Sequence, residues 1–99
     1  MPRKSDRVEF LRETALESTT GKRDVRISDL SAGGCYIDTI ATLLEGTIVW
    51  LEIQSPDGDP VRFTGKVAHE SPGMGIGIEF TEMTQAQHDF LASILAPSK

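Results

Sequence analysis

The chain has 99 residues, a formal net charge of −5, one cysteine and two histidines. This length supports one domain with a modest core and excludes a two-lobed enzyme cleft. The acidic balance excludes a general nucleic-acid binder, because such proteins need a broad basic face to release counterions from phosphates. A lone cysteine cannot form an internal disulfide, and the sequence predicts neither a metal centre nor a cofactor.

The first twelve residues differ in charge from the rest of the chain. They carry four basic and two acidic side chains, a net charge of +2: Arg3, Lys4, Arg7, Arg12, Asp6 and Glu9. A small dianionic ligand needs only a local basic clamp, and guanidinium groups suit this role because they grip a phosphate bidentately. No apolar stretch follows these charges, which predicts that the chain has no signal peptide and works in the cytoplasm.

Apolar and polar residues alternate over much of the sequence that follows, which predicts short β-strands. Residues 8–17 form the first strand, which ends before the turn signal Ser18-Thr-Thr-Gly21. The second strand includes Val25 and Ile27 and runs into Asp29. A tight connection at 31–34 leads to a third strand at 35–38.

The later strands are separated by equally clear turn signals. The pattern predicts strands at 48–53, 61–67 and 76–80, with a hairpin at 55–60 and a turn at 71–75 between them. The longest unbroken apolar run, residues 48–51, is far too short to span a membrane. Many short strands at this spacing predict a closed antiparallel barrel or a sandwich.

From residue 84 the period of the sequence changes to that of a helix. Thr84 and Gln87 form a capping box, and five apolar side chains then share one helical face: Ala86, Phe90, Leu91, Ile94 and Leu95. We therefore expect a helix at 84–96 that covers an opening or an edge of the barrel. Trp50, on the outer side of its strand, is expected either under this helix or at the surface as a contact for a ligand or partner.

Two motifs contain residue types that suit guanine and phosphate. They are Arg-x-x-x-Arg, formed by Arg3 and Arg7, and Asp-x-Ser-x-x-Gly, formed by Asp29, Ser31 and Gly34. An arginine can bond bidentately to the O6/N7 edge of guanine, and a carboxylate can accept from the N1–H and N2–H donors of the other edge. A serine hydroxyl can donate or accept, and a glycine lets a ligand approach the backbone closely.

On these motifs, and on the later segments 46–53, 64–67 and 75–80, the chain resembles the PilZ family of bacterial receptor domains for cyclic di-GMP. The resemblance covers nearly the whole chain and implies a mainly β fold, a six-stranded antiparallel β-barrel with a C-terminal α-helix. It implies a single PilZ-like domain over 1–99, in which residues 1–7 form a flexible ligand-binding arm, 8–81 the barrel and 84–96 the helix.

The resemblance also implies a non-catalytic receptor that acts as an adaptor. Its ligand would be cyclic di-GMP, held by Arg3 and Arg7 on one side and by Asp29, Ser31 and Gly34 on the other. The arm is expected to become ordered when the ligand binds and to change the surface offered to a partner protein. Such an adaptor would control motility, adhesion or polysaccharide export, without DNA, RNA or an inserted membrane segment as a partner.

Plainer interpretations of the same residues remain open. Arg3 and Arg7 are also ordinary solvated charges near a terminus, Asp29 and Ser31 can cap neighbouring N–H groups in a turn, and Gly34 can be a requirement of the backbone alone. The main alternative function is a PilZ-like barrel that acts as a protein-interaction module without nucleotide binding.

Two further functions are disfavoured. An oligonucleotide-binding barrel conflicts with the acidity of the chain and its few aromatic residues. An enzyme is not expected, since the sequence contains no arrangement of a nucleophile with a general base, no paired-carboxylate signature and no P-loop. Cys35 is expected to be a packed side chain, and His69 and His88 to be surface residues.

Overall fold

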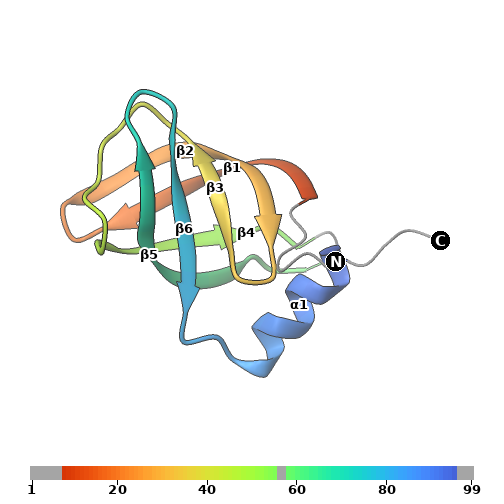
Figure 1. The fold of residues 1–99 in the computed structure, drawn as a ribbon. Helices are drawn as coiled ribbons and strands as arrows, with labels where there is room; N and C mark the ends of the chain where they lie inside the picture. The colour runs from red at the N-terminus through yellow and green to blue at the C-terminus, as the bar shows by residue number, and fades with distance from the viewer. Residues whose placement is uncertain (1–7, 56–57, 96–99) are drawn as a thin grey trace, which may run out of the picture.

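The computed structural model describes residues 8–55 and 58–95, which form six strands and one helix (Figure 1). In chain order these are β1 (Val8–Ser18), β2 (Gly21–Ser31), β3 (Gly34–Asp38), β4 (Ile48–Ile53), β5 (Val61–Ser71), β6 (Gly75–Thr81) and α1 (Gln85–Leu95). The strands are antiparallel to their neighbours and close in the order β1-β2-β3-β6-β5-β4. The six-stranded antiparallel barrel with a C-terminal helix, predicted from the sequence, is confirmed.

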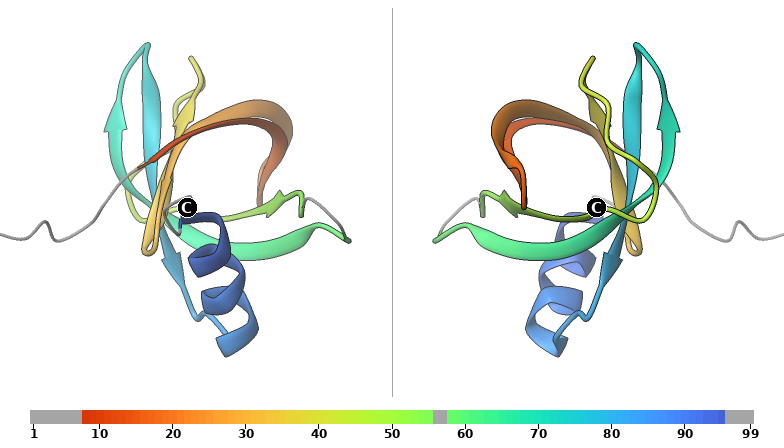
Figure 2. Two further views of the ribbon diagram at one scale, coloured as in Figure 1. Left: turned by 90° about the vertical axis from the view of Figure 1, so that its right-hand side faces the viewer. Right: turned by 90° about the vertical axis from the view of Figure 1, so that its left-hand side faces the viewer.

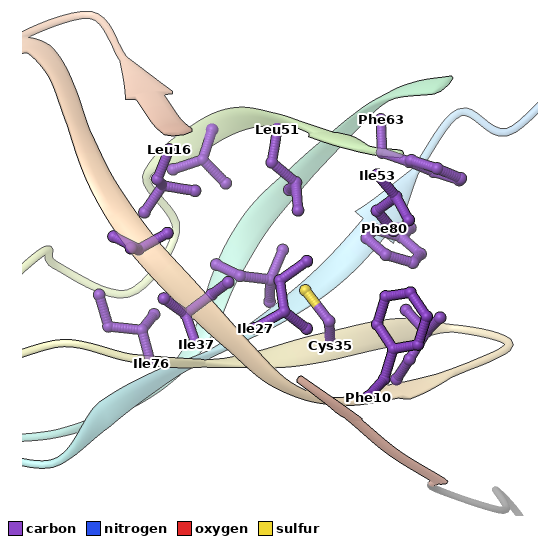
Figure 3. Packing of buried hydrophobic residues seen from close by; sticks show 14 of the residues in the cluster. Phe10, Leu16, Ile27, Cys35, Ile37, Leu51, Ile53, Phe63, Ile76 and Phe80 are labelled. Carbon is purple, nitrogen blue, oxygen red and sulfur yellow. The ribbon is translucent and has the colours of Figure 1, made fainter. Parts of the chain in front are cut away.

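The core lies inside the barrel, because alternate residues of each strand point inward. In β4, Val49, Leu51 and Ile53 are buried whereas Ile48 and Glu52 are exposed. Figure 3 shows the inward side chains of several strands converging, among them Ile27, Ile37, Leu51, Phe63 and Phe80. The Phe63 and Phe80 rings stack with their centroids 4.7 Å apart. Burial of this apolar surface is the main stabilising contribution to the fold.

Cys35 belongs to the same core. Its side chain is completely buried, in agreement with the packing role expected from the sequence.

The barrel closes where β1 meets β4, and this seam is short. Two residue pairs, Glu17 with Trp50 and Ser18 with Val49, make up the ladder there. Across the same seam the Thr14 hydroxyl donates to the Glu52 carbonyl oxygen at 2.6 Å. Trp50 is half-buried beside it, and the described residues that line the small cavity next to Trp50 come from β1, β2, β4 and β5. This placement favours the surface position for Trp50 over one beneath the helix.

The capping box at the start of α1 is confirmed. The Thr84 hydroxyl accepts from the Gln87 backbone N–H at 3.1 Å, and the Gln87 side-chain oxygen accepts from the Thr84 N–H at 2.7 Å. Leu91 is 1% exposed and joins the core, and the Phe90 ring lies 6.1 Å from that of Phe63. The prediction that Ala86 faces the barrel is wrong: this residue is exposed, because the first turn of α1 lies beyond the end of the strands (Figures 1 and 2).

The two ends of the barrel differ. The helix lies at the end where β2 turns into β3, and the turn from β5 to β6 lies at the opposite end (Figures 1 and 2). At that opposite end, the Met74 carbonyl oxygen accepts from the Thr39 N–H at 3.4 Å, which joins the β5–β6 turn to the connection between β3 and β4. Within residues 8–55 and 58–95, no helix combines the length and apolar character needed to cross a membrane.

Candidate functional site: a groove on the outer face of the barrel

Two irregularities in the strand pairing decide which side chains face outward. In β2 the register with β3 shifts between Ile27 and Asp29. In β5 the register with β6 shifts between Val67 and His69. Each extra residue reverses the alternation that follows it, as β-bulges do. Asp29 and His69 would otherwise continue the inward positions of Ile27 and Val67; instead Asp29 is half-exposed and His69 is exposed.

As a result, outward-facing residues form a continuous row across five strands. Direct cross-strand pairing joins them in this order: Glu9, Asp29, Tyr36, Gly77 and His69. A second row lies towards the α1 end, two residues along β2, β3 and β6 and three along the bulged β5: Ser31, Gly34, Glu79 and Lys66. Residues of neighbouring rows are close enough to bind one ligand together.

A groove of about 480 Å³ lies between these two rows. The described residues that line it come from the β2–β3 hairpin, β3, β5 and β6: Ser31, Gly33, Gly34, Tyr36, Ala68, His69, Gly77, Ile78 and Glu79. This volume lies within the range of small-molecule sites. The structure therefore brings Ser31 and Gly34 into one groove, and it places Asp29 beside that groove, paired with Tyr36.

Ser31 and Gly34 also have structural roles in the hairpin that closes the groove. Ser31 is 6% exposed, and its hydroxyl donates to the Gly34 carbonyl oxygen at 3.3 Å. A Cβ at Gly34 would overlap the Ile78 carbonyl oxygen of β6, so only glycine fits at this crossing. Both residues thus have a role in the turn, although the Ser31 hydroxyl donates to a carbonyl oxygen and does not cap an N–H group, and both also border the groove.

A larger hollow, about 650 Å³, lies elsewhere on the outer face but has the wrong charge for an anionic ligand. Three carboxylates line it, from Glu13, Asp24 and Asp38, against the single guanidinium of Arg26. That guanidinium is already paired with Asp38 at 3.3 Å. Carboxylates that line a hollow repel a phosphodiester placed in it, so the groove with Ser31 and Gly34 is the better candidate for an anionic ligand.

The first motif lies outside the described residues. Arg3 and Arg7 precede Val8, the first residue of β1, and Val8 pairs with Leu30 of β2. The chain therefore enters the barrel beside the segment from Asp29 to Ser31. Among the described residues, no group of three or more His, Cys, Asp or Glu side chains is arranged to hold a metal ion.

Comparison with known families decides the classification. The family model for the PilZ domain matches residues 2–96. The chain belongs to the PilZ domain family. A comparison with curated protein sequences gives no match. The family assignment suggested by the two motifs and the later strands is therefore confirmed.

Three solved structures share the PilZ fold with this chain. The PilZ domain of CeSA from a cellulose-synthesizing bacterium has a TM-score of 0.70 and 21% identity, covering 92% of this chain and 95% of that one. Borreliella burgdorferi PlzA in complex with c-di-GMP has a TM-score of 0.69 and 16% identity, covering 91% and 39%. The Bacillus subtilis inhibitor of motility, MotI/DgrA, has a TM-score of 0.77 and 14% identity, covering 95% and 49%. The PilZ chain thus spans about two fifths of PlzA and about half of MotI.

Most residues that line the groove have no place in the motif-based prediction, among them Tyr36, His69 and Gly77. The sequence pattern predicts Tyr36 and Gly77 as strand residues and His69 as a surface residue, without a part in the site. The sequence does contain a signal for His69: the inward series Phe63, Gly65, Val67 is broken by the polar histidine. A polar residue at the next inward position indicates a bulge, and bulges cluster beside functional sites.

Proposed function

We propose that this PilZ domain is a non-catalytic receptor for cyclic di-GMP that works in the cytoplasm. PilZ domains are generally receptors of this kind, and the structural neighbour PlzA has been crystallised in complex with c-di-GMP. The observation that carries the proposal is the groove itself, because Ser31 and Gly34 border it and Asp29 lies beside it in the adjoining row. Three residues of one motif thus reach a single face of the barrel.

The described part of the groove lacks the positive charge that a dianion requires. Of the described residues that line it, none is Lys or Arg, and Glu79 adds a carboxylate 3.9 Å from the Lys66 ammonium. Lys66 is already paired with Glu79 beside the groove, so further cations would come from outside the barrel. Arg7 immediately precedes Val8, which pairs beside Asp29, and Arg3 lies five residues before Val8. Five extended residues span at most roughly 18 Å, so both arginines can reach the groove.

In the mechanism that we infer, the ligand fixes residues 1–7 across the groove. Arg3 and Arg7 grip phosphate and guanine from one side, and Asp29, Ser31 and Gly34 hold the other. Fixing each backbone residue costs roughly 1–2 kcal/mol, which the charge-assisted contacts to the nucleotide offset. The domain then presents a different shape and charge at the β2–β3 hairpin, and a partner protein binds to that changed surface.

Apolar side chains on the connection between β3 and β4 support a protein partner. Ile40 is 85% exposed and Leu44 is 80% exposed, and apolar side chains of this kind are common on surfaces that bind other proteins. The structural neighbour MotI is an inhibitor of motility, which fits an adaptor that acts on another protein. The same two residues also favour the alternative function, a protein-interaction module that binds no nucleotide.

Calorimetric titration with cyclic di-GMP separates the two functions. The wild-type protein is expected to bind, and Arg7→Ala is expected to weaken binding at least about tenfold, since a charge-assisted bidentate contact is lost. Arg12→Ala is the matched control: the Arg12 guanidinium lies 4.5 Å from the Phe10 ring centroid and donates to the Leu11 carbonyl oxygen, so it is occupied on β1.

Two results would count against the proposal. Absence of binding by the wild-type protein would leave the interaction module as the function. Equal affinities of Arg7→Ala and Arg12→Ala would show that the N-terminal arginines supply no specific contact. Backbone amide NMR tests the ordering step, because the amides of residues 1–7 should gain protection from exchange only when the ligand is added.

A further inference from the structure

The floor of the groove is a glycine that the fold does not require. A Cβ at Gly34, Gly65 or Gly75 would overlap backbone or side-chain atoms of neighbouring residues. A Cβ at Gly77 would meet only ordinary contacts, 3.6 Å to the Cβ of His69 and 3.9 Å to the Cδ1 of Tyr36. Gly77 also has no positive φ angle. Glycine inside a strand weakens it, and the usual reason for its presence is the close approach of another group.

No neighbouring backbone atom of the described structure comes closer to that position than the His69 carbonyl oxygen at 3.8 Å. A group that approaches Gly77 closely would therefore come from outside the barrel. The half-exposed Gly77 lines the groove, so the missing side chain leaves room directly above the β6 backbone.

Two ring side chains border this floor. Tyr36 of β3 and His69 of β5 pair with Gly77 from either side. The Tyr36 ring extends along β6 and covers Gly75, where a Cβ would lie 2.6 Å from its Cε2, so its position is fixed by packing. The His69 Nε2 lies 3.2 Å from the Ser71 hydroxyl oxygen, and this hydrogen bond holds the imidazole. Two oriented rings thus lie on either side of an open strip of backbone.

We propose that Tyr36 and His69 hold one guanine base of cyclic di-GMP against the backbone of Gly77. This inference rests on the proposed function and assigns three residues outside both motifs to the same site. A planar base can lie close to a strand only where no side chain intervenes, and ring side chains bind bases through their π faces and edges. Tyr36 then lies between the base and Asp29 in the row, and the Gly34–Glu79 pair lies two residue pairs along β3 and β6, so the base lies next to the residues of the second motif.

The composition of the chain allows a direct test without any substitution. Tyr36 is the only tyrosine, and His69 and His88 are the only histidines. In a titration with cyclic di-GMP followed by NMR of the aromatic side chains, the ring signals of Tyr36 and His69 should shift. Those of His88, exposed on α1, and of the single tryptophan, Trp50, should stay unchanged.

Two pairs of variants test the same contact through affinity. Gly77→Val should weaken binding at least about tenfold because the valine side chain fills the floor. Its fold should persist, since the Cβ meets ordinary contacts and valine favours strands. Ala15→Val adds bulk to a strand residue of β1 that does not line the groove and should bind like wild type. His69→Ala should weaken binding at least about fivefold, and His88→Ala should not.

The outcomes distinguish this inference from the proposed function. If the wild-type protein binds but the Tyr36 and His69 rings do not respond, or Gly77→Val keeps full affinity while circular dichroism shows a native fold, the base lies elsewhere and only this inference is overturned. If the wild-type protein does not bind cyclic di-GMP, both are overturned.

Discussion

Alanine substitution of the two adjacent glycines in the β2–β3 hairpin should affect stability differently: Gly34→Ala should destabilise the fold and Gly33→Ala should not. A Cβ at Gly34 overlaps the Ile78 carbonyl oxygen and lies 3.1 Å from its carbonyl carbon and 3.3 Å from the Glu79 Cα. All three are backbone atoms of β6, so no side-chain rotation relieves the clash and β3 must move away from β6. Overpacking of this kind typically costs about 1–3 kcal/mol, and we expect the upper part of that range for Gly34→Ala. The melting temperature should then fall by roughly 10–20 °C.

Gly33→Ala is the matched control. Gly33 is exposed, a Cβ there has no atom within 4 Å, and its φ angle is not positive. Its stability should stay within about 0.5 kcal/mol of wild type. Thermal and urea denaturation, followed by the fluorescence of the single half-buried Trp50 and by circular dichroism, measures both variants. Equal stabilities of Gly34→Ala and Gly33→Ala would refute the close approach of β3 to β6 as the reason for this glycine.

Other substitutions test the helix and the base selectivity of the site. Leu91→Ala should lower stability by about 2–5 kcal/mol, because Leu91 is 1% exposed in the core. Thr84→Ala should lower the free energy of unfolding by about 1 kcal/mol, because the hydrogen bond from the Gln87 N–H to the Thr84 hydroxyl is lost. Urea denaturation measures the stability of both variants. Competition titration should show at least about hundredfold weaker binding of cyclic di-AMP than of cyclic di-GMP. Adenine presents a bare N1 acceptor to Asp29, and each unpaired buried polar group costs roughly 1–3 kcal/mol.

The elements of the fold could be predicted from the sequence because they depend on local patterns. A continuously apolar segment predicts β4 at Ile48–Ile53 with the bounds that the structure has, and the Thr84 and Gln87 pair predicts the start of α1. The order of the strands depends on pairings between distant residues, such as Tyr36 with Gly77, and became available only through the resemblance to PilZ domains. Local pattern alone left a barrel and a sandwich equally open.

The site could be predicted only in part, for a reason that lies in the bulges. Strict alternation from Val25 and Ile27 would turn Asp29 into the core, and strict alternation from Phe63 and Val67 would do the same to His69. One extra residue in each strand reverses these orientations. The motif singles out Asp29 through its chemistry and not its geometry. His69 belongs to no motif, and although its polarity at an inward position indicates a bulge, its place beside Gly77 depends on the pairing of β5 with β6.

The division of the proposed site between the barrel and the N-terminal residues has an electrostatic cause. The chain as a whole is acidic, with a net charge of −5, and Glu79 faces the groove that is proposed to receive a dianion. A barrel with permanent cations in that groove would attract any small anion, whereas in the proposed mechanism cations on residues 1–7 act there only when a ligand of the right shape fixes them. Selectivity would then come from the groove and charge from the N-terminal residues. In this mechanism the ordering cost of those residues would lower affinity, and in return a nucleotide that fits the groove would produce the change of surface that a partner can detect.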